Sequence, residues 1–310
     1  MGLFSMNYDK PGKGVDENAP EKRGFFQFWD IYFRKFSRFV RANLLYVVTL
    51  IPTFLIIFFL VGIISSSILS ADGIQNFLMQ SAEQSANDLG DAAMAQEYFM
   101  QTLGLLDVIL RFVLSFLYVI LWGAGPATAG MTFIMRNYAN EQHAWIFSDF
   151  KDAVKENWKQ SLAVFLIDII VFILFFVAIR VYSGMDGIMR SLQYVIWVFG
   201  VVYTMMHFYI YPMMVTFRLS LKDLYRNALL FAIGALPSNV LALFLVLLVN
   251  IGPAYLALRF AGDYLILVLF VLAILQVVMF LSFSCFIVNF NTYPKMKKYM
   301  LNVVKEKEEA

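Results

Sequence analysis

A few polar side chains lie inside long apolar stretches of the chain, and their types are the ones best suited to chemistry. They are Asp168, His207, Asn250 and Gln276. A carboxylate and an imidazole at similar depth in a membrane can bind a proton or a solute near the midplane, where transporters usually hold their substrate. The alternative is a structural network of hydrogen bonds that holds helices together. Both interpretations place these residues in one polar layer, joined by Tyr203 and Tyr209.

Other kinds of site are not indicated by the sequence. Cys285 is the one cysteine, and His143 and His207 are the two histidines. An intrachain disulfide and a multi-cysteine metal cluster are therefore excluded. The sequence contains neither a phosphate-binding loop nor a nucleophile beside a histidine. We expect no enzyme, no catalytic residue, no cofactor and no metal site, and we expect Cys285 to be a buried packing residue.

A run of small residues, 123–130, interrupts the second long apolar stretch and contains the candidate hinge residues Gly125, Pro126 and Gly130. Proline removes a backbone donor and clashes with the preceding turn of a helix. We therefore expect a span that kinks near Pro126 and straightens in the variant Pro126→Ala. The glycines suit either tight helix packing or a hinge that lines a cavity.

If these residues lie inside a membrane, membrane-spanning helices must position them. The composition of the chain is that of a membrane protein. Hydrophobic residues make up 61% of the 310 residues and charged residues 15%, against about 45–50% and 25% in soluble domains. The formal net charge of +2 gives no sign of a nucleic-acid partner. The sequence predicts an all-α polytopic membrane protein in contact with the lipid bilayer.

A membrane-spanning helix needs roughly 20 apolar residues, and six stretches qualify. They are 44–69, 105–135, 162–181, 192–217, 240–258 and 264–289. We expect a six-span membrane domain over 25–300, preceded by a polar tail at 1–24 and followed by a charged tail at 301–310. The tail at 1–24 lacks the apolar core of a signal peptide.

The lysines and arginines are distributed unequally between the two sides of these spans. Four of the 24 lie on one side or near its helix ends, which leaves 20 on the side of the termini. The four are Arg111, Arg180, Arg190 and Arg259. Because basic residues favour the cytosolic side, we expect a cell-membrane protein with both termini in the cytosol.

Three segments on the side of the termini share an amphipathic pattern, and each leads into a span. They are 25–43, 147–160 and 219–236. The apolar face is mainly aromatic in the first two and mainly leucine and alanine in the third, and basic side chains lie beside it or opposite, which is typical of helices in the headgroup region. The candidate contacts on these interfacial helices are Trp29, Phe36, Phe150, Trp158 and Tyr225. The helices either anchor the protein in lipid or meet a cytosolic partner.

The largest segment on the opposite side, 70–104, carries acidic residues and no basic residue. Its Ala, Gln, Glu and Met content predicts helix. Either it is a helical hairpin that rests on the outer ends of the bundle, or it is a lid or an acidic docking surface.

One segment resembles a known family. It contains Gly-Pro-Ala-Thr at 125–128, a short charged turn, and the run His-Ala-Trp-Ile-Phe-Ser-Asp-Phe at 143–150. This pattern is similar to that of the YesL-like integral membrane proteins of Gram-positive bacteria, a family of unknown function. The similarity is sharpest over 125–162, and the acidic segment 70–104 departs from the compact family pattern.

The resemblance implies an association with carbohydrate uptake, because genes of that family often lie beside genes of sugar import and degradation. The first expectation is an accessory or regulatory protein attached to a carbohydrate transport system or another membrane protein. The polar residues inside the spans indicate an alternative, a small-solute transporter or permease. A membrane scaffold without a substrate is the third. The sequence leaves the oligomeric state open.

Overall fold

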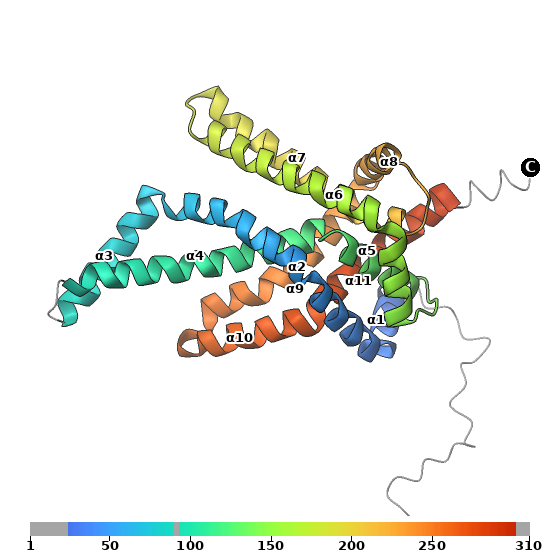
Figure 1. Ribbon diagram of the computed structural model, residues 1–310, viewed down its shortest axis with the longest axis horizontal. Helices are drawn as coiled ribbons and strands as arrows, with labels where there is room; N and C mark the ends of the chain where they lie inside the picture. Colours follow the sequence, from blue (N-terminus) through green and yellow to red (C-terminus); the bar gives the residue numbers. More distant parts are fainter. Residues whose placement is uncertain (1–23, 90–92, 302–310) are drawn as a thin grey trace, which may run out of the picture.

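The computed structural model describes residues 24–89 and 93–301, and all regular structure in these ranges is helical (Figure 1). Six helices are long and apolar enough to cross a membrane, which confirms the prediction of an all-α polytopic membrane protein. They are Phe36–Leu69, Gln96–Trp122, Ile146–Ser183, Ile188–Met214, Leu236–Phe260 and Leu267–Leu301. The predicted tails lie outside the described residues, apart from Gly24 and Leu301.

The spans form three hairpins. The helices α2 (Phe36–Leu69) and α4 (Ala93–Trp122) make the first, and α6 (Ile146–Ser183) and α7 (Ile188–Met214) make the second. The third joins α9 (Leu236–Phe260), through a short turn at Gly262–Tyr264, to a last helix of several parts. These parts are α10 (Leu265–Leu275), a π-helical turn (Gln276–Phe280), α11 (Leu281–Met296) and a second π-helical turn (Lys297–Leu301).

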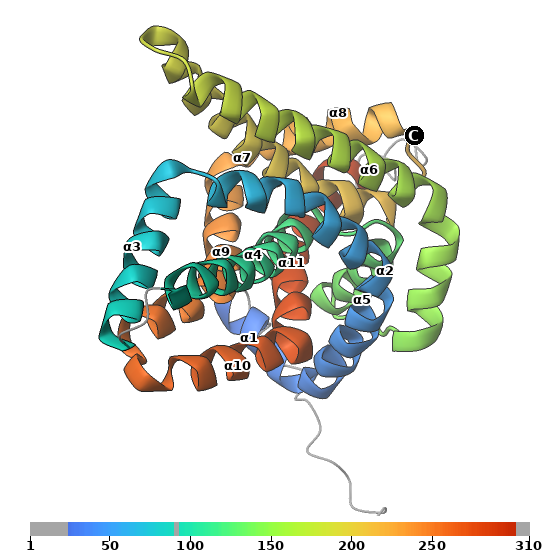
Figure 2. The ribbon, with the colours of Figure 1, turned by 60° about the vertical axis from the view of Figure 1, so that its left-hand side comes forward.

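The hairpins spread apart at the end that carries α3 (Asp72–Leu89) and come together at the other end, as Figures 1 and 2 show. We call the second end the basic end. It comprises α1 (Phe25–Arg34), the turn between α5 and α6, α8 (Leu221–Gly234) and the end of the last helix. Most of the described lysines and arginines lie there, so the basic end corresponds to the side that the sequence predicts to be cytosolic.

The short helix α5 (Pro126–Ala139) and the second half of α7 form the centre of the bundle. Every residue from Thr204 to Met214 is buried, as are those from Ala127 to Thr132. Small side chains on α5 permit this close approach, since a Cβ at Gly130 would lie 2.8 Å from Val154 and 2.9 Å from Phe150 on α6. The outer halves of α6 and α7 keep their apolar side chains exposed, as lipid-facing surfaces do.

The second span does not kink as the sequence predicts; it ends. Helix α4 stops at Trp122, and a separate helix, α5, begins at Pro126. Gly123 and Gly125 adopt φ values of +82° and +65°, a left-handed conformation that turns the chain and that glycine adopts most easily. Pro126 occupies the first helical position, where its missing N–H has no partner to lose. The glycines therefore make the break, and Pro126→Ala would not straighten it.

The structure agrees to different degrees with the three predicted interfacial helices. The first segment is not one helix, because the chain breaks at Lys35 between α1 and α2. The second is the beginning of α6, which bends in Figure 2 before it enters the bundle. The third is a helix of its own, α8, and the Ser220 hydroxyl caps it by accepting a hydrogen bond from the backbone N–H of Asp223 at 3.2 Å.

The segment 70–104 is helical over its described residues, as predicted. Helix α3 and the beginning of α4 form a hairpin at the outer end of the first pair of spans (Figure 1). Residues 90–92, which connect the two helices, lie outside the described residues. Asp107 on α4 forms an ion pair with Arg111 at 2.7 Å, one helical turn away.

Helix α1 is held on the bundle by charged and polar contacts with the turn that follows α5. The carboxylate of Glu141 accepts hydrogen bonds from Arg34 at 2.7 Å and from Gln27 at 3.1 Å. The ammonium of Lys35 donates to the carbonyl of Gln142 at 3.2 Å. The bonds from Arg34 and Gln27 lower the pKa of Glu141 below its usual value of 4.5. Burial lowers the pKa of Lys35 to about 8.

We expect Glu141→Gln to loosen α1. An exposed ion pair contributes about 0.2–1 kcal/mol, so amide exchange in Phe25–Arg34 should rise about 1.5- to 5-fold. Because the pKa of Glu141 is lowered in the folded protein, its contribution is present above pH 4.5 and is lost as the pH falls through the lowered value. Hydrogen exchange with mass spectrometry tests both effects, with Glu156→Gln on the exposed side of α6 as control. Equal exchange in the two variants would contradict this role of Glu141.

Candidate functional site

The two ionisable candidates of the sequence, Asp168 on α6 and His207 on α7, are in contact. The Nε2 atom of His207 lies 2.9 Å from Oδ1 of Asp168. Asp168 is completely buried and His207 is 5% exposed. The contact arises because α6 and α7 pack as an antiparallel pair and each turns its one ionisable side chain at this depth toward the other.

Tyr203, one helical turn before His207 on α7, completes this cluster. Its hydroxyl donates a hydrogen bond to Oδ1 of Asp168 at 2.7 Å, and its backbone carbonyl lies 3.0 Å from Nδ1 of His207. A carbonyl oxygen can only accept, so Nδ1 carries a hydrogen. This contact therefore assigns one ring hydrogen, the one on Nδ1, and leaves the hydrogen on Nε2 to be assigned.

The state of Nε2 follows from the hydrogen bond between His207 and Asp168. A hydrogen bond between Nε2 and Oδ1 requires one proton, which resides on either atom. The pair is then either imidazolium with carboxylate or neutral imidazole with carboxylic acid. Both states have a net charge of zero, which suits a buried site.

Aromatic side chains enclose the pair. The indole of Trp122 on α4 stacks on the imidazole, with ring centroids 5.9 Å apart and an interplanar angle of 21°. Its Nε1–H donates to Thr204 at 2.9 Å, which fixes the orientation of the ring. Tyr203 also contacts the imidazole, with ring centroids 4.8 Å apart. Aromatic faces stabilise a cation, so this enclosure favours the charged imidazolium.

Three polar atoms near the pair are buried without a well-formed hydrogen bond among the described residues. They are Asp168 Oδ2, Tyr118 Oη and Tyr225 Oη. Burial raises the pKa of Tyr225 far above its usual value, and the Asp168 carboxylate raises it further. Tyr225 belongs to α8, so a helix of the basic end places a side chain within electrostatic reach of Asp168. Buried polar groups nearly always have partners, so each of these atoms requires an explanation, such as an ordered water or a functional role.

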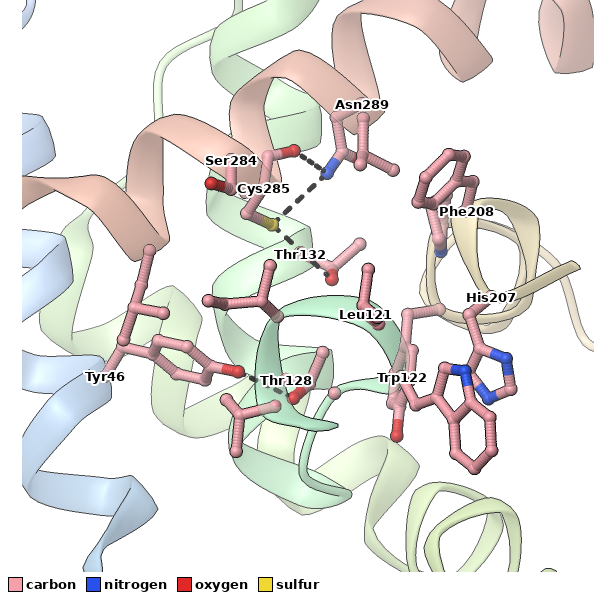
Figure 3. Close-up of a pocket in the computed structure, with 17 residues that line it drawn as sticks. Tyr46, Leu121, Trp122, Thr128, Thr132, His207, Phe208, Ser284, Cys285 and Asn289 are labelled. Atoms are coloured by element: carbon pink, nitrogen blue, oxygen red, sulfur yellow. Dashed lines mark hydrogen bonds between the residues drawn. The ribbon is translucent and has the colours of Figure 1, made fainter. Parts of the chain in front are cut away.

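A cavity of about 60 Å³ lies on the other side of His207 (Figure 3). Its lining includes Trp122, Thr132, Cys285 and Asn289, and the Oδ1 atom of Asn289 has no hydrogen-bond partner among the described residues. A water molecule needs roughly 10–15 Å³ of such space and several polar neighbours. The cavity therefore has room for a few waters, and it is far below the roughly 300 Å³ of the smallest common ligand pockets.

A second cavity, of about 280 Å³, lies between α2, α3 and α4 at the opposite end. Asp107 lines it, but both carboxylate oxygens of Asp107 already bond to Ser65 and Arg111. The two cavities share no lining residue.

The other two candidates, Asn250 and Gln276, are in contact with each other. Gln276 donates to Asn250 at 2.8 Å, and Asn250 donates to Ser284 at 2.7 Å. No hydrogen bond between described residues links this cluster to Asp168 or His207. Tyr209 bonds instead to Asn239 at 2.8 Å. The structure therefore separates the expected polar layer into distinct clusters.

The sequence analysis did not single out Asn43, although it lies at the centre of the second cluster. Its amide donates to the carbonyls of Gln276 at 3.3 Å and Val277 at 2.6 Å, and its Oδ1 accepts from the N–H of Ser282 at 2.5 Å. By taking these backbone partners, Asn43 accounts for the π-helical turn in the last span. The sequence does contain a signal that could have found Asn43, which is its polar amide among the apolar residues at the start of the first span.

The candidate hinge residues form a tightly bonded turn. The N–H of Gly125 donates to the Tyr211 hydroxyl at 3.1 Å, and that of Ala124 donates to the Thr128 hydroxyl at 2.7 Å. The Thr128 hydroxyl also bonds to Tyr46 at 2.8 Å (Figure 3). These contacts hold the break between α4 and α5 in one conformation, and Thr128 lines the small cavity.

The aromatic candidates of the basic end divide into surface and core. Trp158 and Phe36 are exposed and Trp29 is partly buried, whereas Phe150 is buried against Gly130 and Tyr225 is half-buried near Asp168. The most exposed aromatic residues at this end are others, between 68% and 73% exposed. They are Phe25, Phe26, Phe33, Trp145 and Phe147. All but Trp145 belong to the interfacial segments that the sequence identified, but which of their side chains are exposed depends on how α1 and α6 pack.

Residues 107–179 match the model of a family described as "Protein of unknown function, DUF624". The matched segment covers much of α4, all of α5 and most of α6, and it includes Asp168 but not His207. No curated protein and no solved structure matches the chain. Over this segment the chain is similar to a family of unknown function.

Proposed function

We propose that the protein is an accessory or regulatory membrane component attached to a carbohydrate-uptake system, with both termini in the cytosol. The YesL-like proteins that the chain resembles are members of the matched family. The match includes the whole of 125–162, where the resemblance is sharpest. The concentration of basic residues at the end with α1 and α8 supports the orientation.

The packed centre of the bundle carries this proposal. A permease for sugars needs a site that holds at least one sugar ring, and common ligand pockets start near 300 Å³. The cavity beside His207 is about 60 Å³, and Trp122, Gly123 and Tyr211 are among the residues that line it. A solid core with exposed aromatic residues at the basic end fits a protein that binds a partner better than one that moves a sugar.

Affinity purification from native membranes in mild detergent, followed by mass spectrometry, tests the proposal. We expect sugar-transporter subunits in a fixed ratio to the protein. The double variant Trp145→Ala/Phe147→Ala should reduce their recovery about tenfold or more, because an aromatic anchor of an interface contributes about 2 kcal/mol. Phe199→Ala, on the exposed outer half of α7, is the control. Recovery of the protein alone, or equal recovery from all variants, would contradict the proposal.

The buried pair of Asp168 and His207 favours a second candidate, a small-solute transporter or permease. Ionisable residues inside a membrane bundle are costly and are usually retained for function. Solute flux into proteoliposomes that depends on Asp168 would support this candidate. A scaffold without a substrate would show neither flux nor a transporter partner.

A further inference from the structure

We propose that Asp168 and His207 form a proton-binding site, which takes up one proton on Asp168 Oδ2 as the pH falls and changes from net charge zero to +1. The site goes beyond the proposed accessory role and does not depend on it. The hydrogen bonds, the aromatic enclosure and the cavity beside His207 each support it independently.

The first support is the occupation of the two carboxylate oxygens. Oδ1 already engages Tyr203 at 2.7 Å and His207 at 2.9 Å, whereas Oδ2 has no partner among the described residues. A proton that arrives at the neutral pair therefore binds to Oδ2. The product is a carboxylic acid beside an imidazolium that keeps both of its ring hydrogens.

The second support is the set of groups that face Asp168. They are Tyr118 on α4, Tyr203 and Tyr211 on α7, and Tyr225 on α8, all within electrostatic reach of the carboxylate. None of these four side chains is basic, and the charge that opposes an added proton is that of the His207 imidazolium itself. The Tyr118 oxygen has no hydrogen-bond partner among the described residues and can accept the hydrogen bond of a carboxylic acid, whereas the Tyr225 hydroxyl already lies within hydrogen-bonding reach of Tyr203.

The third support is the environment of His207, which stabilises the cation that remains after Asp168 becomes neutral. Trp122 covers one face of the imidazole, and Tyr203 and Tyr211 contact it with ring centroids 4.8 Å and 6.4 Å away. A cation over aromatic faces gains about 0.5–2 kcal/mol. The state with charge +1 is thus accommodated without a second carboxylate.

The size and ligands of the site select a proton over other cations. Asp168 lines neither of the two cavities described above, and its Oδ2 atom is buried. Hard cations prefer six or more oxygen ligands, and the described residues contain no cluster of three His, Cys, Asp or Glu side chains that could hold a metal. His207 borders the cavity, which has room for a few waters (Figure 3).

Two spectroscopic measurements on the full chain in lipid nanodiscs test the proposal. Because the chain has two histidines, ¹⁵N-histidine labelling gives two imidazoles, and exposed His143 serves as the internal reference. Infrared difference spectra between alkaline and acid buffer detect the carboxylic acid. Asp168→Asn removes the proposed acceptor, and Asp152→Asn, an exposed aspartate on α6, is the matched control.

We expect both nitrogens of His207 to carry hydrogen in acid, with Nδ1 remaining protonated in alkali. A carboxylic-acid band should appear in acid, disappear in Asp168→Asn and persist in Asp152→Asn. The absence of an Asp168-dependent band across the pH range in which the wild type stays folded would overturn the proposal. A His207 that is protonated on Nε2 alone would also overturn it, because the bonding from Tyr203 would then be different. Neither outcome depends on whether a sugar transporter co-purifies.

Discussion

Replacing Asp168 with alanine is expected to lower the free energy of unfolding by about 2–4 kcal/mol. The carboxylate accepts from Tyr203 and bonds to His207 in a completely buried position. Without it, two buried polar groups lose their partner, and each loss costs about 1–3 kcal/mol. Removal of one member of a buried charged pair has effects of the same size or larger.

Asp168→Asn provides the comparison that separates shape from charge. The amide keeps an acceptor oxygen and the volume of the side chain, so we expect a loss of about 1 kcal/mol and a folded protein. Leu166→Ala, at a position 52% exposed on the same helix, controls for general effects on α6. Unfolding in bicelles, followed by circular dichroism, gives the three values. Equal and small losses for the alanine and asparagine variants would show that the pair does not stabilise the α6–α7 hairpin.

Gly123→Ala is the second substitution with a large expected effect, a loss of about 2–4 kcal/mol. A Cβ at this position would lie 2.8 Å from Cγ2 of Thr128 and 2.9 Å from Cε2 of Tyr211, closer than real contacts permit. The φ of +82° adds about 1–2 kcal/mol of backbone strain for any L side chain. Overpacking of a filled core adds about 1–3 kcal/mol more.

Two further variants test the reason for this loss. Gly187→Ala introduces the same backbone strain at φ +61°, but a Cβ there has no atom within 4 Å, so we expect a loss of about 1–2 kcal/mol. Pro126→Ala should cost less than about 1 kcal/mol, because the first position of a helix tolerates most residues. Spin-label distances across the break should be unchanged in Pro126→Ala. A straightened α4–α5 in that variant would show that the proline, and not Gly123 and Gly125, makes the break.

The sequence predicted the number of spans more accurately than the ends of its helices. All six spans are present, because about 20 consecutive apolar residues suffice to predict one. The predicted second span included 123–135, which is apolar enough to continue a helix but belongs to the separate helix α5. The first interfacial segment was likewise predicted to run past Lys35, where the chain turns into α2. Hydropathy does not report such breaks, since they depend on backbone conformation.

For the polar site, too, the sequence predicted which residues are involved but not how they are arranged. The sequence identified Asp168, His207, Asn250 and Gln276, because polar side chains in apolar stretches stand out without any structure. It did not identify the two separate pairs that they form, and it indicated Tyr225 as an interfacial contact and not as a neighbour of Asp168. Asn43 was missed because its hydrogen-bond partners lie 233 or more residues away in the chain, so its role is not visible in the local sequence.

The sequence by itself determined the class of the protein, the number of spans, the unequal distribution of charge and the inventory of polar residues inside the bundle. These depend on composition and local periodicity, which a chain carries before it folds. Only the tertiary structure decided that α4 ends at Trp122, that His207 contacts Asp168 and that a helix of the basic end places a side chain within electrostatic reach of Asp168. Each of these depends on the rotation and depth at which helices pack, and side chains 39 or more residues apart set that packing together.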